Sequence, residues 1–227
     1  MRPDAKPFMN APYDFVVFDC DGVILQSNAL KSRAFADALS GDPQVLIDQF
    51  VAYHQANGGV SRYRKFEHYF TSIRKLHPYD DRLKWTLVDY ADRVKRGLIA
   101  CLTVPGVVDF LTHLNSRRIR CAVNSGGDQA ELRDVFESRR LSQHFTHILG
   151  SPTSKVDNMR FLREAGFMHG QGVMFGDSRS DFEAAQAFDL DFVFVGYESE
   201  WKDAHDVLRL HEAKSIADFH AIEIHEW

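Results

Sequence analysis

The spacing of apolar and polar positions divides the chain into three stretches. Residues 14–21 read DFVVFDCD, an apolar run that stops at carboxylates and Gly22, as a strand buried on both faces does before a loop. From Ser27 to about Ala100 the apolar positions recur at helical spacing, and no strand-like run interrupts them. After Val104-Pro105-Gly106 the pattern changes to short strands that alternate with helices.

The third stretch predicts alternating strands and helices, namely Arg120–Asn124, Asp128–Arg140, Thr146–Leu149, Lys155–Glu164, Gly172–Phe175, Arg179–Phe188 and Phe192–Val195. Such alternation implies right-handed crossovers and one parallel sheet, which the strand at 14–21 should join. We therefore predict an α/β fold: a Rossmann-like parallel sheet core of residues 1–26 and 101–227, with an inserted α-helical cap domain of residues 27–100. The segment Trp201–Trp227 carries no motif and is expected to complete the edge of the core.

Composition and charge exclude several classes of protein. The 227 residues are 44% hydrophobic and 26% charged, which is typical of a globular chain. The net charge of −5 offers no basic surplus for nucleic acid or an anionic membrane, and no apolar run approaches membrane-spanning length. Residues 1–12 carry charges and prolines where a signal peptide needs an apolar core. Three cysteines without CxxC spacing cannot form a disulfide framework, so we expect a cytoplasmic protein.

Polar residues stand where each predicted strand ends. Ligands of open parallel sheets bind outside the carboxyl ends of the strands, so these residues should converge on one rim. They are Asp19-Cys20-Asp21-Gly22, Asn124-Ser125-Gly126-Gly127, Lys155 and Gly176-Asp177-Ser178-Arg179-Ser180-Asp181. Crowded carboxylates raise one another's pKa values unless a cation lies among them. Hard oxygen ligands favour Mg²⁺, which shares its site with a phosphate.

This set of groups suits phosphoryl transfer. A carboxylate can attack phosphorus to give an aspartyl-phosphate, which splits one difficult displacement into two. The charge on the phosphoryl oxygens then requires backbone N–H groups, a hydroxyl, a lysine and a metal around it. The predicted rim carries residues that can supply the N–H groups, the hydroxyl and the lysine, and carboxylates that can bind the metal.

Four ordered motifs resemble those of the haloacid dehalogenase superfamily of phosphatases, which carry a helical C1-type cap inserted after the first motif. The motifs are FDCDGVI at Phe18–Ile24, NSGG at Asn124–Gly127, Lys155, and GDSRSD at Gly176–Asp181. The resemblance extends over nearly the whole chain from residue 14 to residue 196. Gln26 stands where many members have an aspartate, so the resemblance does not predict the contacts at the hinge of the cap.

The resemblance implies a role for each core residue. Asp19 corresponds to the nucleophile, and Asp21 to the general acid that later acts as the base. Lys155 would neutralise the nucleophile and the phosphate. The phosphoryl oxygens would be held by Ser125 and by the N–H groups of Gly126 and Cys20. Mg²⁺ would bind Asp19, the main-chain carbonyl of Asp21 and Asp177, with Asp181 as a second acid linked to the metal. The dehalogenases lack the second acid of the first motif, so Asp21 favours phosphate chemistry.

Structural roles remain as alternatives for several of these residues. Lys155 could be a surface lysine at a helix start, and Ser125 could cap the next helix. Asp181 could be an ordinary first-turn acid favoured by the helix dipole.

The predicted cap offers candidates for substrate recognition. Its segment Tyr53–Phe66, YHQANGGVSRYRKF, is similar to caps of phosphoglycolate-phosphatase-like proteins. Arg62 and Lys65 follow the Gly58-Gly59 break, beyond which Ser61 suits an N-cap, and could bind substrate; the alternative is a solvated helix face. His54 is a weaker candidate because the eleven histidines show no ligand spacing. Apolar positions such as Phe66 predict a cap core.

Taken with the resemblance, these features predict a Mg²⁺-dependent phosphomonoester hydrolase acting on a small phosphorylated metabolite, such as a sugar phosphate or a phosphoglycolate-like compound. An aspartyl-phosphate would be the intermediate. Alternatives of the same fold are a phosphomutase or a phosphonate hydrolase; the latter needs a cap lysine for a Schiff base, and Lys31 is the candidate. A non-catalytic binding relative is disfavoured because a binder does not need a nucleophile beside an acid. The sequence carries no signal for an oligomeric state.

Overall fold

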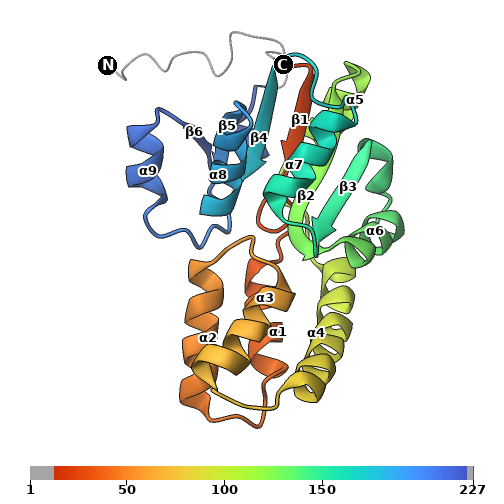
Figure 1. The fold of residues 1–227 in the computed structure, drawn as a ribbon. Helices are drawn as coiled ribbons and strands as arrows, with labels where there is room; N and C mark the ends of the chain where they lie inside the picture. Colours follow the sequence, from red (N-terminus) through yellow and green to blue (C-terminus); the bar gives the residue numbers. More distant parts are fainter. Residues whose placement is uncertain (1–12, 224–226) are drawn as a thin grey trace.

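A six-stranded parallel sheet forms the centre of the computed structural model, which describes residues 13–223 and residue 227. The strand order is β3-β2-β1-β4-β5-β6, so β1 lies between β2 and β4 (Figure 1). The strands are β1 Phe15–Phe18, β2 Arg120–Asp128, β3 His147–Ser151, β4 Gly172–Gly176, β5 Asp191–Val195 and β6 Lys214–Ile216. The predicted α/β class and parallel sheet are confirmed.

Helices cover both faces of the sheet because the fully buried strands carry apolar side chains on each side. Val16 and Phe18 of β1 pack into one cluster, with residues of α5 Val107–Ser116 and α6 Gln129–Ser138. Phe15 and Val17, which point the other way, pack into a second cluster. That cluster includes residues of α7 Lys155–Glu164, α8 Arg179–Ala187 and α9 Ala204–Leu210.

Most element boundaries agree with the sequence to within a few residues, and α7 has the predicted ends. β2 is the exception, because it runs past Asn124 to Asp128, where it regains pairing with Ser151 of β3 across an irregularity in register. As predicted, the C-terminal segment completes the edge of the core, where β6 pairs with β5. The predicted absence of a signal peptide falls on residues 1–12, outside the described residues.

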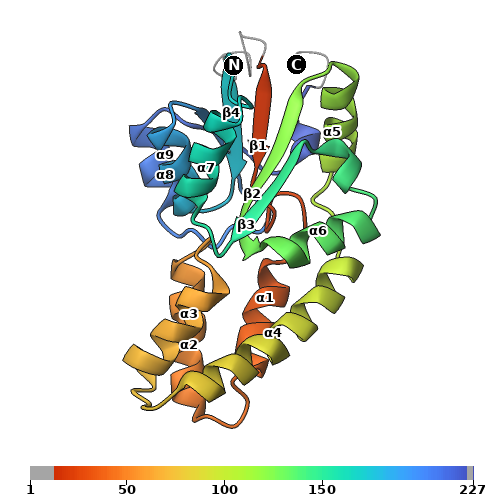
Figure 2. The same ribbon diagram turned by 45° about the vertical axis from the view of Figure 1, so that its right-hand side comes forward.

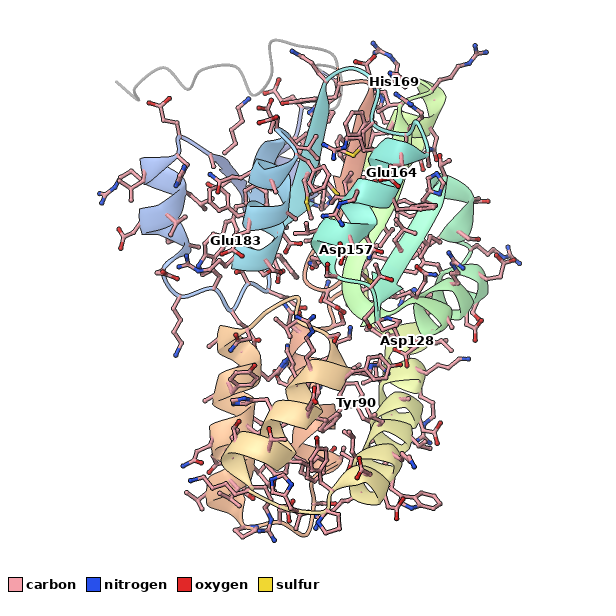
Figure 3. All side chains as sticks on the ribbon, in the orientation of Figure 1. Tyr90, Asp128, Asp157, Glu164, His169 and Glu183 are labelled. Atoms are coloured by element: carbon pink, nitrogen blue, oxygen red, sulfur yellow. The ribbon has the colours of Figure 1, made fainter. Side chains whose placement is uncertain are left out.

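A group of helices at residues 28–100, here called the helical block, lies beyond the carboxyl ends of the strands (Figures 1 and 2). It comprises α1 Asn28–Asp37, α2 Gln44–Ala56, α3 Arg62–His68, the π-helix η1 Tyr69–Ile73 and α4 Asp80–Ala100. The block has a core of buried, mutually contacting rings, among them Phe35, Phe50, Phe66 and Tyr90. Tyr90 lies inside the block in Figure 3.

Two linkers running side by side join the helical block to the sheet. The Gln26 N–H donates to the Leu102 carbonyl at 2.9 Å, and the Val104 N–H donates to the Ile24 carbonyl at 2.9 Å. The Gln26 side chain donates to the Thr103 carbonyl at 2.8 Å. The glutamine at this position therefore fastens the outgoing linker to the returning one. Within the described part of the chain, no helix combines the length and apolar character needed to cross a membrane.

Candidate active site

The loop after β1 places a buried carboxylate at the centre of the sheet rim. Asp19 is only 2% exposed, and its N–H donates to the Phe175 carbonyl of β4 at 2.9 Å. The chain then turns at Gly22, whose φ of +73° is one that side chains rarely adopt. A Cβ at this position would also collide with the Asp177 carboxylate and the Asn28 amide. Glycine therefore lets the first and last motifs come together.

Three buried carboxylates and one lysine converge at this point. Asp19, Asp177 and Asp181 each offer an oxygen within 4.8 Å of the others. Lys155 Nζ lies 3.2 Å from Asp19 Oδ1 and donates a shorter hydrogen bond to Asp181 Oδ1. Asn124 donates to the Lys155 carbonyl at 3.0 Å, which anchors the start of α7. Lys155 is therefore buried against the acids, and its alternative interpretation as a surface lysine is wrong.

The electrostatics of this cluster favour an additional cation. Burial, followed by the charge of Asp181, raises the pKa of Asp19 to about 7. Burial and the neighbouring Asp19 raise the pKa of Asp177 well above its usual range. Burial lowers the pKa of Lys155, but the charges of Asp181 and Asp19 outweigh it and the net pKa is raised. One ammonium therefore leaves the group of acids with excess negative charge.

The hydrogen bonds of the three acids differ. Asp19 and Asp177 have oxygens that could bind Mg²⁺, whereas both oxygens of Asp181 already accept hydrogen bonds. Asp19 Oδ1 is buried and accepts no hydrogen bond from the described residues, although Lys155 Nζ lies 3.2 Å away. Asp177 Oδ2 accepts one from Asn28 at 2.7 Å. Asp181 instead accepts hydrogen bonds at both oxygens, from Lys155 at one and from Ser178 N–H and Oγ at the other. A hard cation with oxygen ligands fits Asp19 and Asp177. The Asp181 contacts suit the positioning of Lys155 and of the loop after β4.

Asp21, two residues after Asp19, lies in a different environment. One carboxylate oxygen accepts from Ser27 Oγ at 2.6 Å and the other from Lys31 Nζ at 2.5 Å. Burial raises the pKa of Asp21, but the Lys31 charge and these hydrogen bonds outweigh it, and the net pKa is lowered. Burial lowers the pKa of Lys31, but Asp21 raises it to a net value above its usual range. The ammonium lacks the lone pair that a Schiff base requires, which disfavours the phosphonate-hydrolase alternative based on Lys31.

Ser125 and Gly126 lie in the last part of β2. Ser125 is fully buried, and its hydroxyl accepts from the Gly127 N–H at 3.1 Å. Gly126 lies against the helical block, because a Cβ there would collide with the Gly59 carbonyl. The Cys20 N–H faces the Asp19 carboxylate. Of the predicted anion-binding groups, the Cys20 N–H lies beside the Asp19 carboxylate, and Gly126 lines the same cavity as Asp19.

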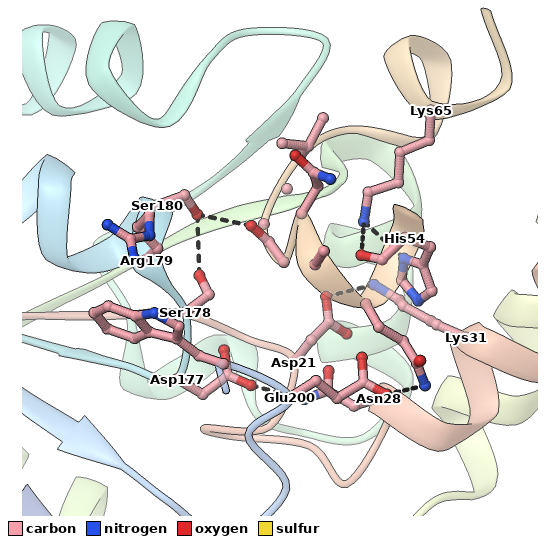
Figure 4. Close-up of a pocket in the computed structure, with 18 of the residues that line it drawn as sticks. Asp21, Asn28, Lys31, His54, Lys65, Asp177, Ser178, Arg179, Ser180 and Glu200 are labelled. Atoms are coloured by element: carbon pink, nitrogen blue, oxygen red, sulfur yellow. Dashed lines mark hydrogen bonds and ion pairs between the residues drawn. The ribbon is translucent and has the colours of Figure 1, made fainter. Parts of the chain in front are cut away.

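A cavity of about 400 Å³ separates the sheet rim from the helical block (Figure 4). The predicted site residues that line it are Asp19, Asp21, Arg62, Lys65, Gly126 and Asp177. The others, buried outside its lining, are Cys20, Ser125, Lys155 and Asp181.

The two predicted cations of the helical block are buried, so their alternative interpretation as a solvated face is wrong. Arg62 is 5% exposed and pairs through both terminal nitrogens with Glu131 of α6, while its guanidinium lies 4.8 Å from the centre of the Tyr90 ring. It therefore links the block to the core. Lys65 is 2% exposed, and its Nζ lies 2.7 Å from His54 Nδ1. Figure 4 shows this pair at the edge of the cavity.

Several residues of the site were not predicted from the sequence. Asn28 bridges the block and the core, since it donates to Asp177 and, at 3.1 Å, to the Glu198 carbonyl. Ser180 Oγ donates to the Gly58 carbonyl at 3.1 Å and closes the loop between α2 and α3 over the rim. The position of Asn28 shortly after the first motif was the only available signal for it. No pattern marks Glu131, because its partner is distant in the chain.

Comparison with solved structures gives the same fold. A predicted phosphoglycolate phosphatase from Haemophilus somnus 129PT superposes with a TM-score of 0.73 at 17% identity, covering 91% of this chain and 95% of that one. CbbY from Rhodobacter sphaeroides in complex with phosphate has a TM-score of 0.69 at 16% identity, covering 92% of this chain and 95% of that one. A β-phosphoglucomutase from Clostridium difficile has a TM-score of 0.68 at 17% identity, covering 95% of each chain. A search of curated proteins found no match.

A family model provides the assignment. The model described as haloacid dehalogenase-like hydrolase matches residues 16–195, a span that begins in β1, includes the helical block and ends with β5. It therefore includes every residue of the acidic cluster together with Lys155. The chain belongs to the haloacid dehalogenase-like hydrolase family.

Proposed function

We propose that the protein is a Mg²⁺-dependent phosphomonoester hydrolase that acts on a small phosphorylated metabolite through an aspartyl-phosphate on Asp19. The observation that carries this proposal is the pair Asp19 and Asp21, which opens on one cavity beside Asp177 and Lys155. Two of the structural neighbours, the phosphoglycolate phosphatase and the β-phosphoglucomutase, are named for small phosphorylated substrates, which is consistent with this class.

In the first step, an Asp19 carboxylate oxygen forms a bond to phosphorus while the bond from phosphorus to the leaving oxygen breaks. Asp21 gives its proton to that oxygen, so that an alcohol departs. Ser125 and the N–H groups of Gly126 and Cys20 stabilise the charge on the phosphoryl oxygens. Lys155 balances the charge on Asp19, from which its Nζ lies 3.2 Å.

In the second step, Asp21 takes a proton from water, whose oxygen attacks phosphorus and releases inorganic phosphate and the Asp19 carboxylate. The ionised state that Lys31 and Ser27 favour for Asp21 suits this base role. The acid role of the first step requires a proton on the same carboxyl group, and therefore a looser contact with Lys31.

Asp19, the Asp21 carbonyl and Asp177 are the proposed ligands of Mg²⁺. When bound, the ion supplies positive charge that compensates the crowded carboxylates and the phosphoryl oxygens. Asp181 would act through Lys155 and Ser178, which its carboxylate already binds.

The helical block is the proposed cap, inserted between the core segments 1–26 and 101–227. Its loop at Gly58-Gly59 covers the rim, and its helices supply the remaining lining of the cavity. Lys65 would contact the leaving half of the substrate, whereas the Glu131 contact assigns Arg62 chiefly to positioning the block. A cytoplasmic location forms part of the proposal and is supported by three cysteines without disulfides.

The decisive experiment replaces the nucleophile. Asp19→Asn should lower kcat on a panel of small phosphomonoesters by roughly a thousandfold or more, because an amide is a poor nucleophile. The exposed Asp109 provides a matched control, and Asp109→Asn should leave kcat unchanged. Substantial turnover by Asp19→Asn, or undiminished wild-type activity in excess chelator, would contradict the proposal.

A further inference from the structure

Three cations of the helical block line the cavity, and two of them are neutralised within the protein. Lys31 pairs with Asp21 at 2.5 Å, and Arg62 pairs with Glu131. Lys65 has no carboxylate within 4.0 Å among residues 13–223 and 227, and contacts only uncharged groups. A buried ammonium without a counterion is costly, and natural proteins normally pair such a charge.

The surroundings of Lys65 form a site with unused hydrogen-bonding capacity. Its Nζ lies 2.7 Å from His54 Nδ1, 3.3 Å from the His54 carbonyl and 5.6 Å from the centre of the Phe35 ring. His54 is 7% exposed, and its Nε2 has no hydrogen-bond partner in the part of the chain that the structure describes. When Lys65 is charged, its ammonium can only donate to Nδ1, so the proton of the neutral ring then lies on Nε2, where it needs an acceptor.

The other charges that act on Lys65 do not compensate it. From the elements around it, these are Asp21 after β1, Lys31 of α1, Lys155 of α7 and Glu200 after β5. The Glu200 carboxylate already accepts from Gln55 at 3.0 Å and from Ser32 at 3.4 Å. The net result of burial, and then of the Lys31 charge, is a Lys65 pKa lowered to about 7.

We propose that the leaving half of the substrate carries a second anionic group, a carboxylate or a further phosphate, that binds to Lys65 and His54. This inference rests on the proposed function and adds the substrate class to it. The two residues line the same cavity as Asp19, so one molecule can reach both ends. An anion would provide the missing countercharge for Lys65 and an acceptor for the ring N–H. A neutral leaving group such as a plain polyol would leave Lys65 uncompensated.

Calorimetric binding to Asp19→Asn protein with Mg²⁺ tests the inference without turnover. Three probes share a phosphate but differ at the other end. 2-Phosphoglycolate carries a carboxylate there, ethane-1,2-diyl bisphosphate a second phosphate, and 2-hydroxyethyl phosphate an uncharged hydroxyl. At least one of the first two should bind about tenfold or more tighter than the third. Which of them does so identifies the second group as a carboxylate or a phosphate. Equal affinity for all three would overturn the inference.

A second replacement assigns the preference to Lys65. Adding Lys65→Met should reduce the affinity ratio to about one, with little effect on 2-hydroxyethyl phosphate. Adding Arg64→Met instead removes an exposed cation from the same helix and should leave the ratio intact. An undiminished ratio in Lys65→Met would overturn the assignment. If that variant does not fold, His54→Phe retains a ring against Phe35, removes the N–H and should lower the ratio several-fold.

Proton linkage provides a readout that a structural role would not change. At about pH 8 most of Lys65 is neutral, and a bound anion raises its pKa, so binding should take up close to one proton. Titrations in two buffers of different ionisation enthalpy measure this uptake, which Lys65→Met should abolish. Wild-type hydrolysis without any charge preference would contradict this inference alone. Charge-selective binding without hydrolysis would contradict the proposed function and leave this inference standing.

Discussion

Asp19 and Asp21 are two residues apart in the chain, yet their environments shift their pKa values in opposite directions. Burial raises the pKa of Asp19 to about 7, whereas the contacts with Lys31 and Ser27 give Asp21 a net lowering. Paired carboxyl groups whose pKa values are driven apart commonly divide chemical roles between them. The two carboxyl groups therefore lie in different environments. For the proposed roles, Asp19 must lose its proton, which a cation bound beside it would favour, and Asp21 must hold one in the first step.

A leaving-group comparison tests the role of Asp21. If its carboxyl group protonates the departing oxygen, Asp21→Asn should lower kcat/KM about a hundredfold or more for an alkyl phosphate, whose alkoxide leaves poorly. The loss should be much smaller for an aryl phosphate such as para-nitrophenyl phosphate, which departs without a proton. Steady-state kinetics on both substrates measure the difference. Equal losses on both would indicate that Asp21 only shapes the site.

The core residues that were predicted from the sequence lie at or shortly after the end of a strand. Asp19, Asp177 and Lys155 each follow a recognisable apolar run, and parallel strands end at one rim, so their convergence follows from topology. Asn28 and Glu131 belong to contacts between segments far apart in the chain. Such contacts depend on how the helical block packs against the sheet, and local sequence patterns do not predict that packing.

Among the elements, the loop between α2 and α3 packs closely against the rim. A Cβ on Gly59 would collide with Ser180 Oγ and lie 3.0 Å from Lys155 Nζ, and its φ is +75°. Gly59→Ala should therefore hold the loop away from the rim and lower kcat/KM by roughly tenfold or more. Steady-state kinetics, together with the melting temperature, would measure the effect.

Gly166 provides the matched control for this substitution. Its φ of +73° is nearly the same, but a Cβ there would meet no atom within 4 Å. Gly166→Ala should thus cost a similar backbone strain, about 1 kcal/mol of stability, with kcat/KM unchanged. Parallel loss of activity in both variants would show that strain, and not the approach of Gly59 to the rim, limits turnover.

Element prediction succeeded where periodicity was strong and failed where tertiary contacts decided. α7 is long and amphipathic, and its ends were predicted correctly. β2 continues through Gly126-Gly127 because β3 offers a partner beyond them, although glycine pairs usually mark a loop. β6 is only three residues long and owes its strand to pairing with β5.

At the scale of the whole molecule, the excess of carboxylates should couple the proposed Mg²⁺ binding to pH. Without metal, the raised pKa keeps a proton on Asp19 below about pH 7, and Mg²⁺ must displace that proton. Its apparent affinity should therefore fall about tenfold or more for each pH unit below about 7, and level off above. The Mg²⁺-induced rise in melting temperature, measured at several pH values, follows this dependence.

Asp19→Asn supplies the control, because its amide binds no proton in this range. The pH dependence of the Mg²⁺ effect should be shallower in this variant, with a remainder from Asp177, whose pKa is also raised. A Mg²⁺ affinity that stays constant from about pH 5.5 to about pH 7.5 in the wild-type protein would contradict the expectation.

The central place of β1 in the sheet determines when the site can form during synthesis. β1 is made early, but its neighbours β2 and β4 begin at Arg120 and Gly172. The apolar side chains of β1 therefore cannot be buried between these strands until most of the chain has been synthesised. The helical block is made between them, and its ring contacts join residues much closer in sequence, which favours early formation. Asp19, the proposed nucleophile, is therefore among the first residues translated, while the group of acids around it is complete only when residue 181 has left the ribosome.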